Sequence, residues 1–153
     1  MTRLRLLLIL CALSVSHGAL GDGDTLKPFT SDGCSLFPDG TYAQQSLWME
    51  CCIRHDIAYW QGGSQAQRLA ADQALEACVS QVGEPEIARL MLAGVRIGGS
   101  PYFPTWYRWG YGWPYQRGYA ALNQQEKQQI QREIRRMKLI LQGLEQSLQS
   151  SPP

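Results

Sequence analysis

Apolar and polar residues recur with a helical period over most of the chain after residue 40, and glycine and proline separate the segments. The first three predicted helices cover residues 42–60, 65–82 and 86–97. Gly62 and Gly63 end the first of them, and Gly83 with Pro85 ends the second. No segment shows the strict alternation of a strand, so the pattern predicts a mainly α fold.

Capping signals mark two of the predicted helix starts. Thr41 is followed three residues later by Gln44, and Ser64 is followed in the same way by Gln67. Each pair matches the capping box, in which the two residues satisfy backbone N–H groups at a helix N-terminus. The third helix lacks such a pair and contains Gly94, which weakens its prediction.

A fourth, longer helix is predicted near the C-terminus, within residues 120–150. Its apolar residues recur at spacings that alternate between four and three, which is a heptad seam. The seam residues are Ile130, Ile134, Met137, Leu141, Leu144 and Leu148. We expect the seam to pair with a second copy of the chain or to dock on its own body. The third possibility is a helix lying on a membrane with its basic residues at the headgroups.

The N-terminus has the layout of a secretory signal peptide. Arg3 and Arg5 precede an apolar stretch over residues 6–15, and small residues follow it. We therefore expect residues 1–18 to be removed. The mature protein is then secreted or extracytoplasmic, in the periplasm or cell envelope if the source is bacterial.

The composition limits the remaining possibilities. A chain of 153 residues suits one domain, expected here over residues 19–100, followed by the 101–119 segment and the last helix. The 14 basic and 13 acidic residues argue against nucleic-acid binding driven by charge. No apolar run reaches the roughly 20 residues that a membrane-spanning helix needs.

Residues 101–119 hold nine of the 15 aromatic side chains. Trp and Tyr favour the membrane interface, because ring and polar tip are both accommodated there. A cover of proline- and glycine-rich chain packed over the helices explains the same composition equally well.

Loss of the leader leaves four cysteines and a single histidine, His55. An even cysteine count in an exported chain indicates two disulfides. A bond between Cys51 and Cys52 is disfavoured, because neighbouring Cα atoms lie about 3.8 Å apart and a disulfide needs about 4.4–6.8 Å. Two connectivities remain.

Asp72 stands out because it lies on an apolar stripe of the second predicted helix, together with Leu69, Leu75 and Val79. A buried carboxylate is costly unless it is paired, and His55 lies on the inward stripe of the first helix. If Cys51 bonds Cys78 and the two helices are antiparallel, Asp72 falls between His55 and Tyr59 along the helix axis.

The same arrangement joins Cys34 to Cys52 and brings the loop at residues 30–42 beside Asp56. The other connectivity, Cys52 to Cys78, turns the Asp56 stripe inward and leaves His55 facing the loop. The first connectivity is favoured, since only it gives every polar residue a partner.

Residues 51–59, CCIRHDIAY, resemble the Cys-Cys-x-x-His-Asp-x-x-Tyr signature of secreted phospholipase A2. Asp72 and Cys78 match the spacing of that family's second-helix aspartate and cysteine, and the segment DGCSLF is similar to the loop of its divergent members. The resemblance covers roughly residues 29–80, about a third of the chain. It implies a disulfide-linked antiparallel helix pair, with an added amphipathic helix at the C-terminus.

The resemblance also implies an activity. His55 would be the general base, drawing a proton from a water that attacks the sn-2 ester of a glycerophospholipid. Asp72 would fix the His55 tautomer, and Tyr59 would hold Asp72 by a hydrogen bond. The substrate would be a phospholipid membrane surface.

Calcium is the cofactor that the resemblance implies. Asp56 would supply a carboxylate, and the carbonyls of Gly33, Ser35 and Phe37 would supply further oxygens. Ser35 and Phe37 stand where the family has glycine, and Asp39 could contribute a side chain instead. The alternative to the enzyme is a catalytically inactive, phospholipase A2-like module of the cell envelope that binds lipid or a partner.

Overall fold

A computed structural model of the protein describes residues 26–150, and the expected leader at residues 1–18 lies outside them. The helices are α1 (Met49–Gln61), α2 (Gln65–Gln81), α3 (Pro85–Gly98), the short 3-10 helix η1 (Tyr115–Arg117) and α4 (Gln124–Ser150). Residues 26–150 contain no strand, so the mainly α prediction is confirmed for this part of the chain.

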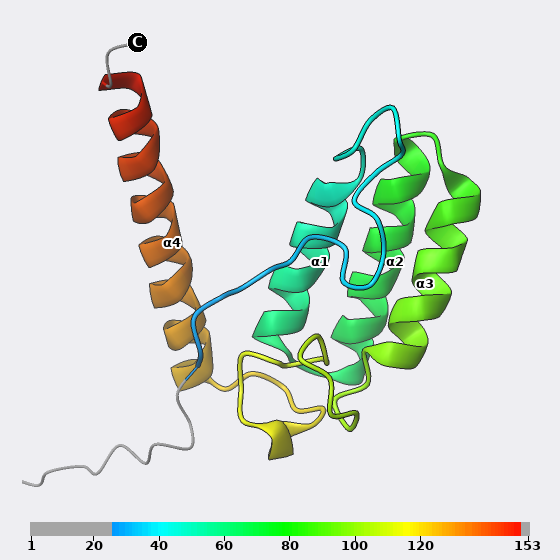
Figure 1. Ribbon diagram of the computed structural model, residues 1–153. Coiled ribbons are helices and arrows are strands. Elements are labelled where there is room, and N and C mark those ends of the chain that lie inside the picture. The colour runs from blue at the N-terminus through cyan, green and yellow to red at the C-terminus, as the bar shows by residue number, and fades with distance from the viewer. Residues whose placement is uncertain (1–25, 151–153) are drawn as a thin grey trace, which may run out of the picture.

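Helices α1, α2 and α3 lie side by side, and α4 stands on the far side of α1 from α3 (Figure 1). Residues 26–48 run from the base of α4 across α1 and form a loop in front of α2. Residues 99–123 close the end of the helical layer where α1 and α3 finish. The loop is attached to α1 by the Cys34–Cys52 bond and by the Ser31–Asp56 hydrogen bond, and it borders a cavity shared with α1 and α3.

The second and third helices follow the sequence prediction closely. The Ser64 hydroxyl accepts the Gln67 N–H, and the Gln67 side chain accepts the Ser64 N–H, which is the predicted capping box. Pro85 occupies the first turn of α3, where its missing N–H costs nothing. Gly94 does not interrupt α3, and it lines a cavity there.

The predicted start of the first helix at residue 42 is wrong, because α1 begins at Met49. Thr41 does accept the N–H of Gln44, at 3.0 Å, but this contact closes a turn. Trp48 explains the difference. Its indole is buried and donates to the Pro38 carbonyl at 2.6 Å, so the chain stays folded back on the loop until residue 48.

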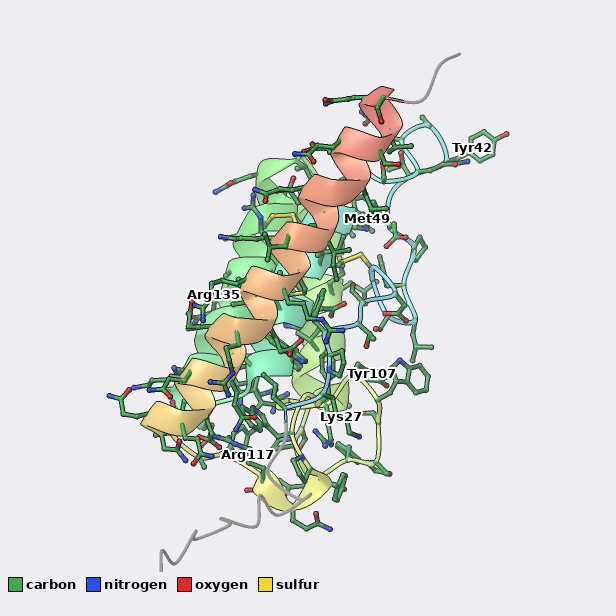
Figure 2. The ribbon with its side chains drawn as sticks, turned by 90° about the vertical axis from the view of Figure 1, so that its left-hand side faces the viewer. Lys27, Tyr42, Met49, Tyr107, Arg117 and Arg135 are labelled. Atoms are coloured by element: carbon green, nitrogen blue, oxygen red, sulfur yellow. A yellow bond between two sulfur atoms is a disulfide. The ribbon has the colours of Figure 1, made fainter. Side chains whose placement is uncertain are left out.

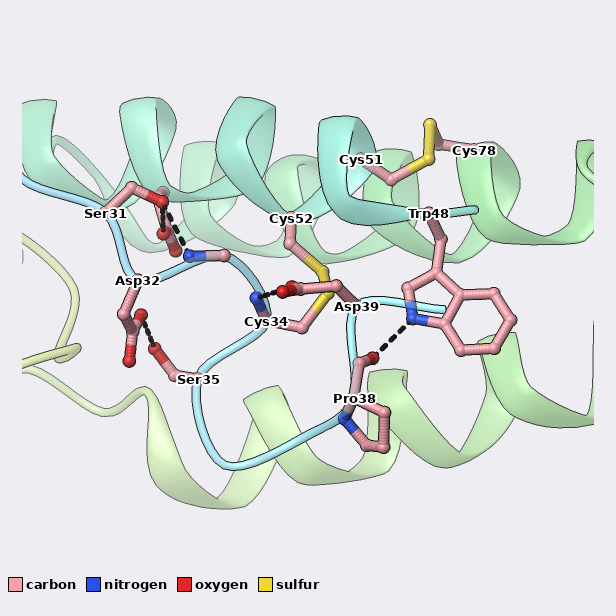
Figure 3. The surroundings of a disulfide bond; sticks show 12 residues. Ser31, Asp32, Cys34, Ser35, Pro38, Asp39, Trp48, Cys51, Cys52 and Cys78 are labelled. Atoms are coloured by element: carbon pink, nitrogen blue, oxygen red, sulfur yellow. Dashed lines mark hydrogen bonds between the residues drawn. A yellow bond between two sulfur atoms is a disulfide. The ribbon is translucent and has the colours of Figure 1, made fainter. Parts of the chain in front are cut away.

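Two disulfides connect α1 to its surroundings, with the favoured connectivity (Figure 3). Cys51 bonds Cys78 of α2, with 5.7 Å between the Cα atoms. Cys52 bonds Cys34 of the loop, with 5.1 Å between the Cα atoms. Consecutive residues of α1 thus anchor a helix on one side and a loop on the other. The core around them consists of Cys34, Trp48, Cys51, Cys52, Leu75, Val79, Ala88 and Met91.

The aromatic segment at residues 101–119 divides between core and surface. Trp113 packs with Trp60 and with Ile130 of α4 in a second core, and Trp109 is also buried. Each buried indole donates to a backbone carbonyl, Trp109 to Gly63 at 3.0 Å. The exposed aromatic residues of the segment are Tyr102, Phe103, Trp106 and Tyr115. The segment is therefore partly a cover over the helices and partly an exposed aromatic surface.

Helix α4 begins at a capping box that the sequence analysis missed. Asn123 accepts the N–H of Glu126, and Glu126 accepts the N–H of Asn123. Arg117 also pairs with Glu126, at 2.9 Å. Ile130 is buried against the body, whereas residues 138–150 are all exposed.

None of the helices within residues 26–150 combines the length and the apolarity needed to cross a bilayer.

We expect replacement of Cys51 and Cys78 by alanine to lower the free energy of unfolding by about 3–4 kcal/mol. The reason is that this bond closes a segment with a sequence separation of 27 residues. Denaturant unfolding without reductant measures the change. Replacement of Cys34 and Cys52 should cost about 3 kcal/mol, because that segment is shorter. Unchanged unfolding midpoints in both variants would contradict the assignment of the two bonds as structural.

Candidate functional site

A buried histidine–aspartate pair joins α1 to α2. His55 Nε2 lies 3.0 Å from Asp72 Oδ1, and the Tyr59 hydroxyl donates to the same oxygen at 2.7 Å. Asp72 is completely buried and His55 is 8% exposed. Asp72 thus lies within reach of both partners, as the antiparallel arrangement predicts. Nδ1 of His55 has no hydrogen-bond partner among residues 26–150.

Two arginines that the sequence analysis missed compensate the charge of Asp72. Arg96 of α3 places Nε 2.8 Å from Asp72 Oδ2, and Arg68 of α2 places Nε 3.9 Å from the same oxygen. The Arg96 contact is an ion pair without hydrogen-bond geometry. One carboxylate oxygen therefore faces His55 and Tyr59, and the other faces cations. Arg68 lies four residues before Asp72, and this spacing could have revealed it.

Arg68 is buried in place of Leu69, which is 37% exposed although the predicted stripe placed it inward. Its guanidinium donates to the Tyr59 hydroxyl, to the Tyr119 hydroxyl and to two carbonyls at the end of α3. A cation with this many acceptors is satisfied without solvent. Helix α2 is thus rotated slightly from the predicted face, and Arg68 connects the pair to residues 101–119.

Neighbouring residues fix both the ring and the hydroxyl of Tyr59. Its ring lies against His55, with 4.1 Å between centroids, and meets the edge of Trp109 at 5.1 Å. Burial raises the pKa of Tyr59, and the Asp72 charge raises it further, so the phenol stays protonated and donates. A Cβ at position 99 would lie 2.5 Å from the Tyr59 hydroxyl, which explains the glycine there.

His55 opens on a cavity of about 190 Å³ between α1, α3 and the N-terminal loop. The wall is mostly apolar, and its polar side chains include His55, Asp56 and Ser35. The apolar part of the wall is made by Leu36, Phe37, Leu75, Leu90, Met91 and Val95. Such a cavity can take an aliphatic chain beside a polar reacting group.

Asp56 lies on the loop side of α1 and is 9% exposed. The Ser31 hydroxyl donates to its Oδ2 at 2.6 Å, and no Lys or Arg within residues 26–150 pairs with it. Burial raises the pKa of Asp56 to about 6, against the opposing effects of the Ser31 hydrogen bond and the His55 charge. A buried carboxylate without a cation is a costly arrangement that a bound cation would relieve.

The structure places Gly33, Ser35 and Phe37 on the same cavity wall as His55 and Asp56. Asp39, by contrast, is turned into the loop, where its Oδ1 accepts the Cys34 N–H at 2.7 Å (Figure 3). It therefore stabilises the loop.

A second hollow, of about 150 Å³, lies on the other side of Asp56. Asp32 and Tyr111 line it, and neither was singled out from the sequence. The Asp32 charge acts on Asp56 and raises its pKa further. The Tyr111 hydroxyl donates to the Thr30 carbonyl at 2.6 Å, which attaches the loop to the aromatic segment.

The donor set around Asp56 consists of oxygen atoms, which suit a hard cation such as calcium. Among residues 26–150, no three His, Cys, Asp or Glu side chains gather around one position. A cation at Asp56 would thus need backbone carbonyls or hydroxyls as its other ligands. Asp56 is buried and uncompensated within residues 26–150, so it could serve as the carboxylate ligand of such a cation.

Comparisons with protein-family models, with curated proteins and with solved structures found no match to this chain.

We expect millimolar calcium to raise the Tm at pH 7.5, and the rise to shrink as the pH falls below about 6, because protons compete for Asp56. Asp56→Asn should abolish the calcium-induced rise, and Glu50→Gln, which removes an exposed carboxylate of the same helix, should retain it. Differential scanning calorimetry measures both. An equal rise in the Asp56→Asn variant would remove Asp56 from the site.

The calcium-free protein gives a separate prediction. The folded pKa of Asp56 lies above its ordinary value, so its stabilising contribution is present below about pH 4 and is lost as the pH rises through about 6. Asp56→Asn should therefore stabilise the calcium-free protein at pH 7.5, by about 1–2 kcal/mol in denaturant unfolding. A destabilised variant would show that the carboxylate is already compensated.

Proposed function

We propose that the protein is a calcium-dependent hydrolase of the phospholipase A2 type, which cleaves the sn-2 ester of glycerophospholipids. The observation that carries the proposal is the buried His55–Asp72 pair, open on an apolar cavity that also contains Asp56. The resemblance of residues 51–59 to the family signature supports the same reaction class. The two disulfides and the helix pair fit a fold of that type.

In this reaction His55 takes a proton from a water in the cavity. Its Nδ1 has no hydrogen-bond partner in the described part of the chain, and its Nε2 faces Asp72, so the ring can accept a proton on one side while the other side is fixed. The water then attacks the ester carbonyl, and the imidazolium returns the proton to the leaving alkoxide. The products are a lysophospholipid and a fatty acid.

Asp72 holds the ring orientation and stabilises the imidazolium that forms. Tyr59 fixes the carboxylate by its hydrogen bond, and Arg96 compensates the charge on the remaining oxygen. Asp72 and Arg96 are positioning residues, because neither lines the cavity. Tyr59 forms part of the cavity wall and positions Asp72 from there.

Asp56 is the residue that would hold calcium, with the loop at residues 33–37 beside it. Bound calcium would supply Lewis-acid stabilisation of the negative charge on the ester oxygen. Ser31 donates to Asp56 Oδ2 and orients the carboxylate.

Exposed apolar side chains border the two hollows. Leu36 is 79% exposed and Leu90 is 58% exposed, and both line the cavity. Trp106 is 68% exposed and lines the second hollow. Apolar and aromatic groups around the opening of an apolar cavity suit contact with a lipid surface.

A non-catalytic module that binds lipid remains the second candidate. The observation in its favour is the loop, where Leu36 has a φ of 58° and side chains occupy positions 35 and 37. A loop with side chains at these positions can turn its backbone carbonyls toward a cation less freely than a loop with glycine there. Lipid binding without turnover would support this candidate.

We expect His55→Gln to reduce calcium-dependent hydrolysis of phospholipid vesicles at least about 1,000-fold, because the variant has no general base. Fatty-acid release measures the rate. The matched control is Arg54→Gln, an exposed substitution one residue earlier on α1, which should keep the activity. Activity that survives His55→Gln, or that is insensitive to a calcium chelator, would overturn the mechanism.

Trp106→Ala should reduce hydrolysis of vesicles about tenfold and leave hydrolysis of a monomeric short-chain ester unchanged, because the indole contacts the lipid surface and not the reacting groups. Tyr42→Ala is the control, since Tyr42 is fully exposed and lies far from Tyr107 of the cavity wall (Figure 2). Equal losses on both substrates would assign Trp106 to the cavity.

A further inference from the structure

The outer half of α4 presents an apolar seam that nothing in the described chain covers. The seam begins in the second core, where Ile130 is buried, and continues along the same face of the helix. Beyond the body it consists of Met137, Leu141, Leu144 and Leu148, which we call the outer seam. Leu141 is 64% exposed, Leu144 56% and Leu148 77%.

We propose that the outer seam pairs with the outer seam of a second copy of this chain, with the two helices antiparallel. The inner seam residues, Ile130 and Ile134, pack on the second core of their own chain. The outer seam remains available to the second copy. The sequence left these two uses of the heptads as alternatives, and the structure assigns one use to each half. This proposal does not depend on the proposed hydrolase activity.

The charges flanking the outer seam are complementary in the antiparallel register. Lys138 and Glu145 each directly follow a seam residue, so both occupy heptad position e, and neither has an ion-pair partner within residues 26–150. In antiparallel coiled coils e faces e of the partner. With Leu141 level with Leu144 of the second copy, Lys138 and Glu145 of opposite helices lie about 3 Å apart along the axis.

The same register fits the length of the helix. Met137 lies level with Leu148 of the second copy, and the helix end at Ser150 reaches the level of Arg135. Arg135 directly follows Ile134, the last seam residue that packs on the second core. The paired stretch thus begins where docking on the body ends. The negative end of each helix dipole meets Arg135 and Arg136 of the other copy.

A membrane surface is the other occupant that this face could take. A helix lying on lipid carries basic residues along its polar face. Between residues 139 and 150 the only charged residue is Glu145, which anionic headgroups would repel. The charge pattern therefore favours the second copy.

The first experiment is sedimentation velocity of the disulfide-bonded protein at about 10–500 µM, because a pairing of two heptads makes a weak dimer. Lys138→Glu should weaken the dimer about tenfold, and Lys138→Glu with Glu145→Lys should restore it. Arg132→Glu is the matched control, since it makes the same charge change on the same helix at a position opposite the seam. It should leave the dimer unchanged.

The second experiment tests the register by cross-linking. An equimolar mixture of Leu141→Cys and Leu144→Cys should form a disulfide-linked heterodimer, and Leu141→Cys alone should not. The reverse result, a disulfide-linked Leu141→Cys homodimer without the heterodimer, would indicate a parallel pair and would overturn the register. A monomer at all concentrations, with vesicle binding that is lost in Leu144→Asp, would overturn the proposal in favour of a lipid surface. These substitutions lie on exposed positions, so the body remains folded, which circular dichroism checks.

Discussion

The cost of burying the Asp72 carboxylate is the constraint on which the rest of the structure depends. This side chain is fully removed from solvent, and the side chains that surround it come from three helices, with Arg68 of its own helix α2 among them. Helix α1 supplies His55 and Tyr59, and α3 supplies Arg96. The Cys51–Cys78 bond sets the register of α1 against α2 that makes these contacts possible.

Asp56 presents the opposite situation one residue after His55. It is also buried, but within residues 26–150 the only hydrogen-bond donor to its carboxylate is the Ser31 hydroxyl, and its pKa is raised to about 6. The two carboxylates of this small site thus differ. Side chains of the protein compensate the charge of Asp72, and no such group compensates that of Asp56 within residues 26–150. Under the proposed function, this difference would assign Asp72 to positioning His55 and Asp56 to holding an external cation.

Much of this site could be predicted because it depends on short-range rules. Helical spacing and disulfide geometry were enough to join His55 to Asp72, with the favoured connectivity. The rest involves contacts between segments remote in sequence. The indole of Trp48 delays the start of α1, and Arg96 reaches Asp72 only because α3 packs against α2. Neither contact has a local signature. The burial of Arg68 required the actual rotation of α2, which periodicity gives only approximately.

The adjacency of Cys51 and Cys52 has a consequence for when the site can exist. Both cross-links leave α1 from the same turn, so reduction of both bonds would release the loop and the second helix from that turn. We expect the chain to hold the base and the acid in a less fixed alignment before oxidation. Under the proposed function, a newly made polypeptide would therefore lack the fixed base and acid until both bonds form, and their formation requires an oxidising compartment.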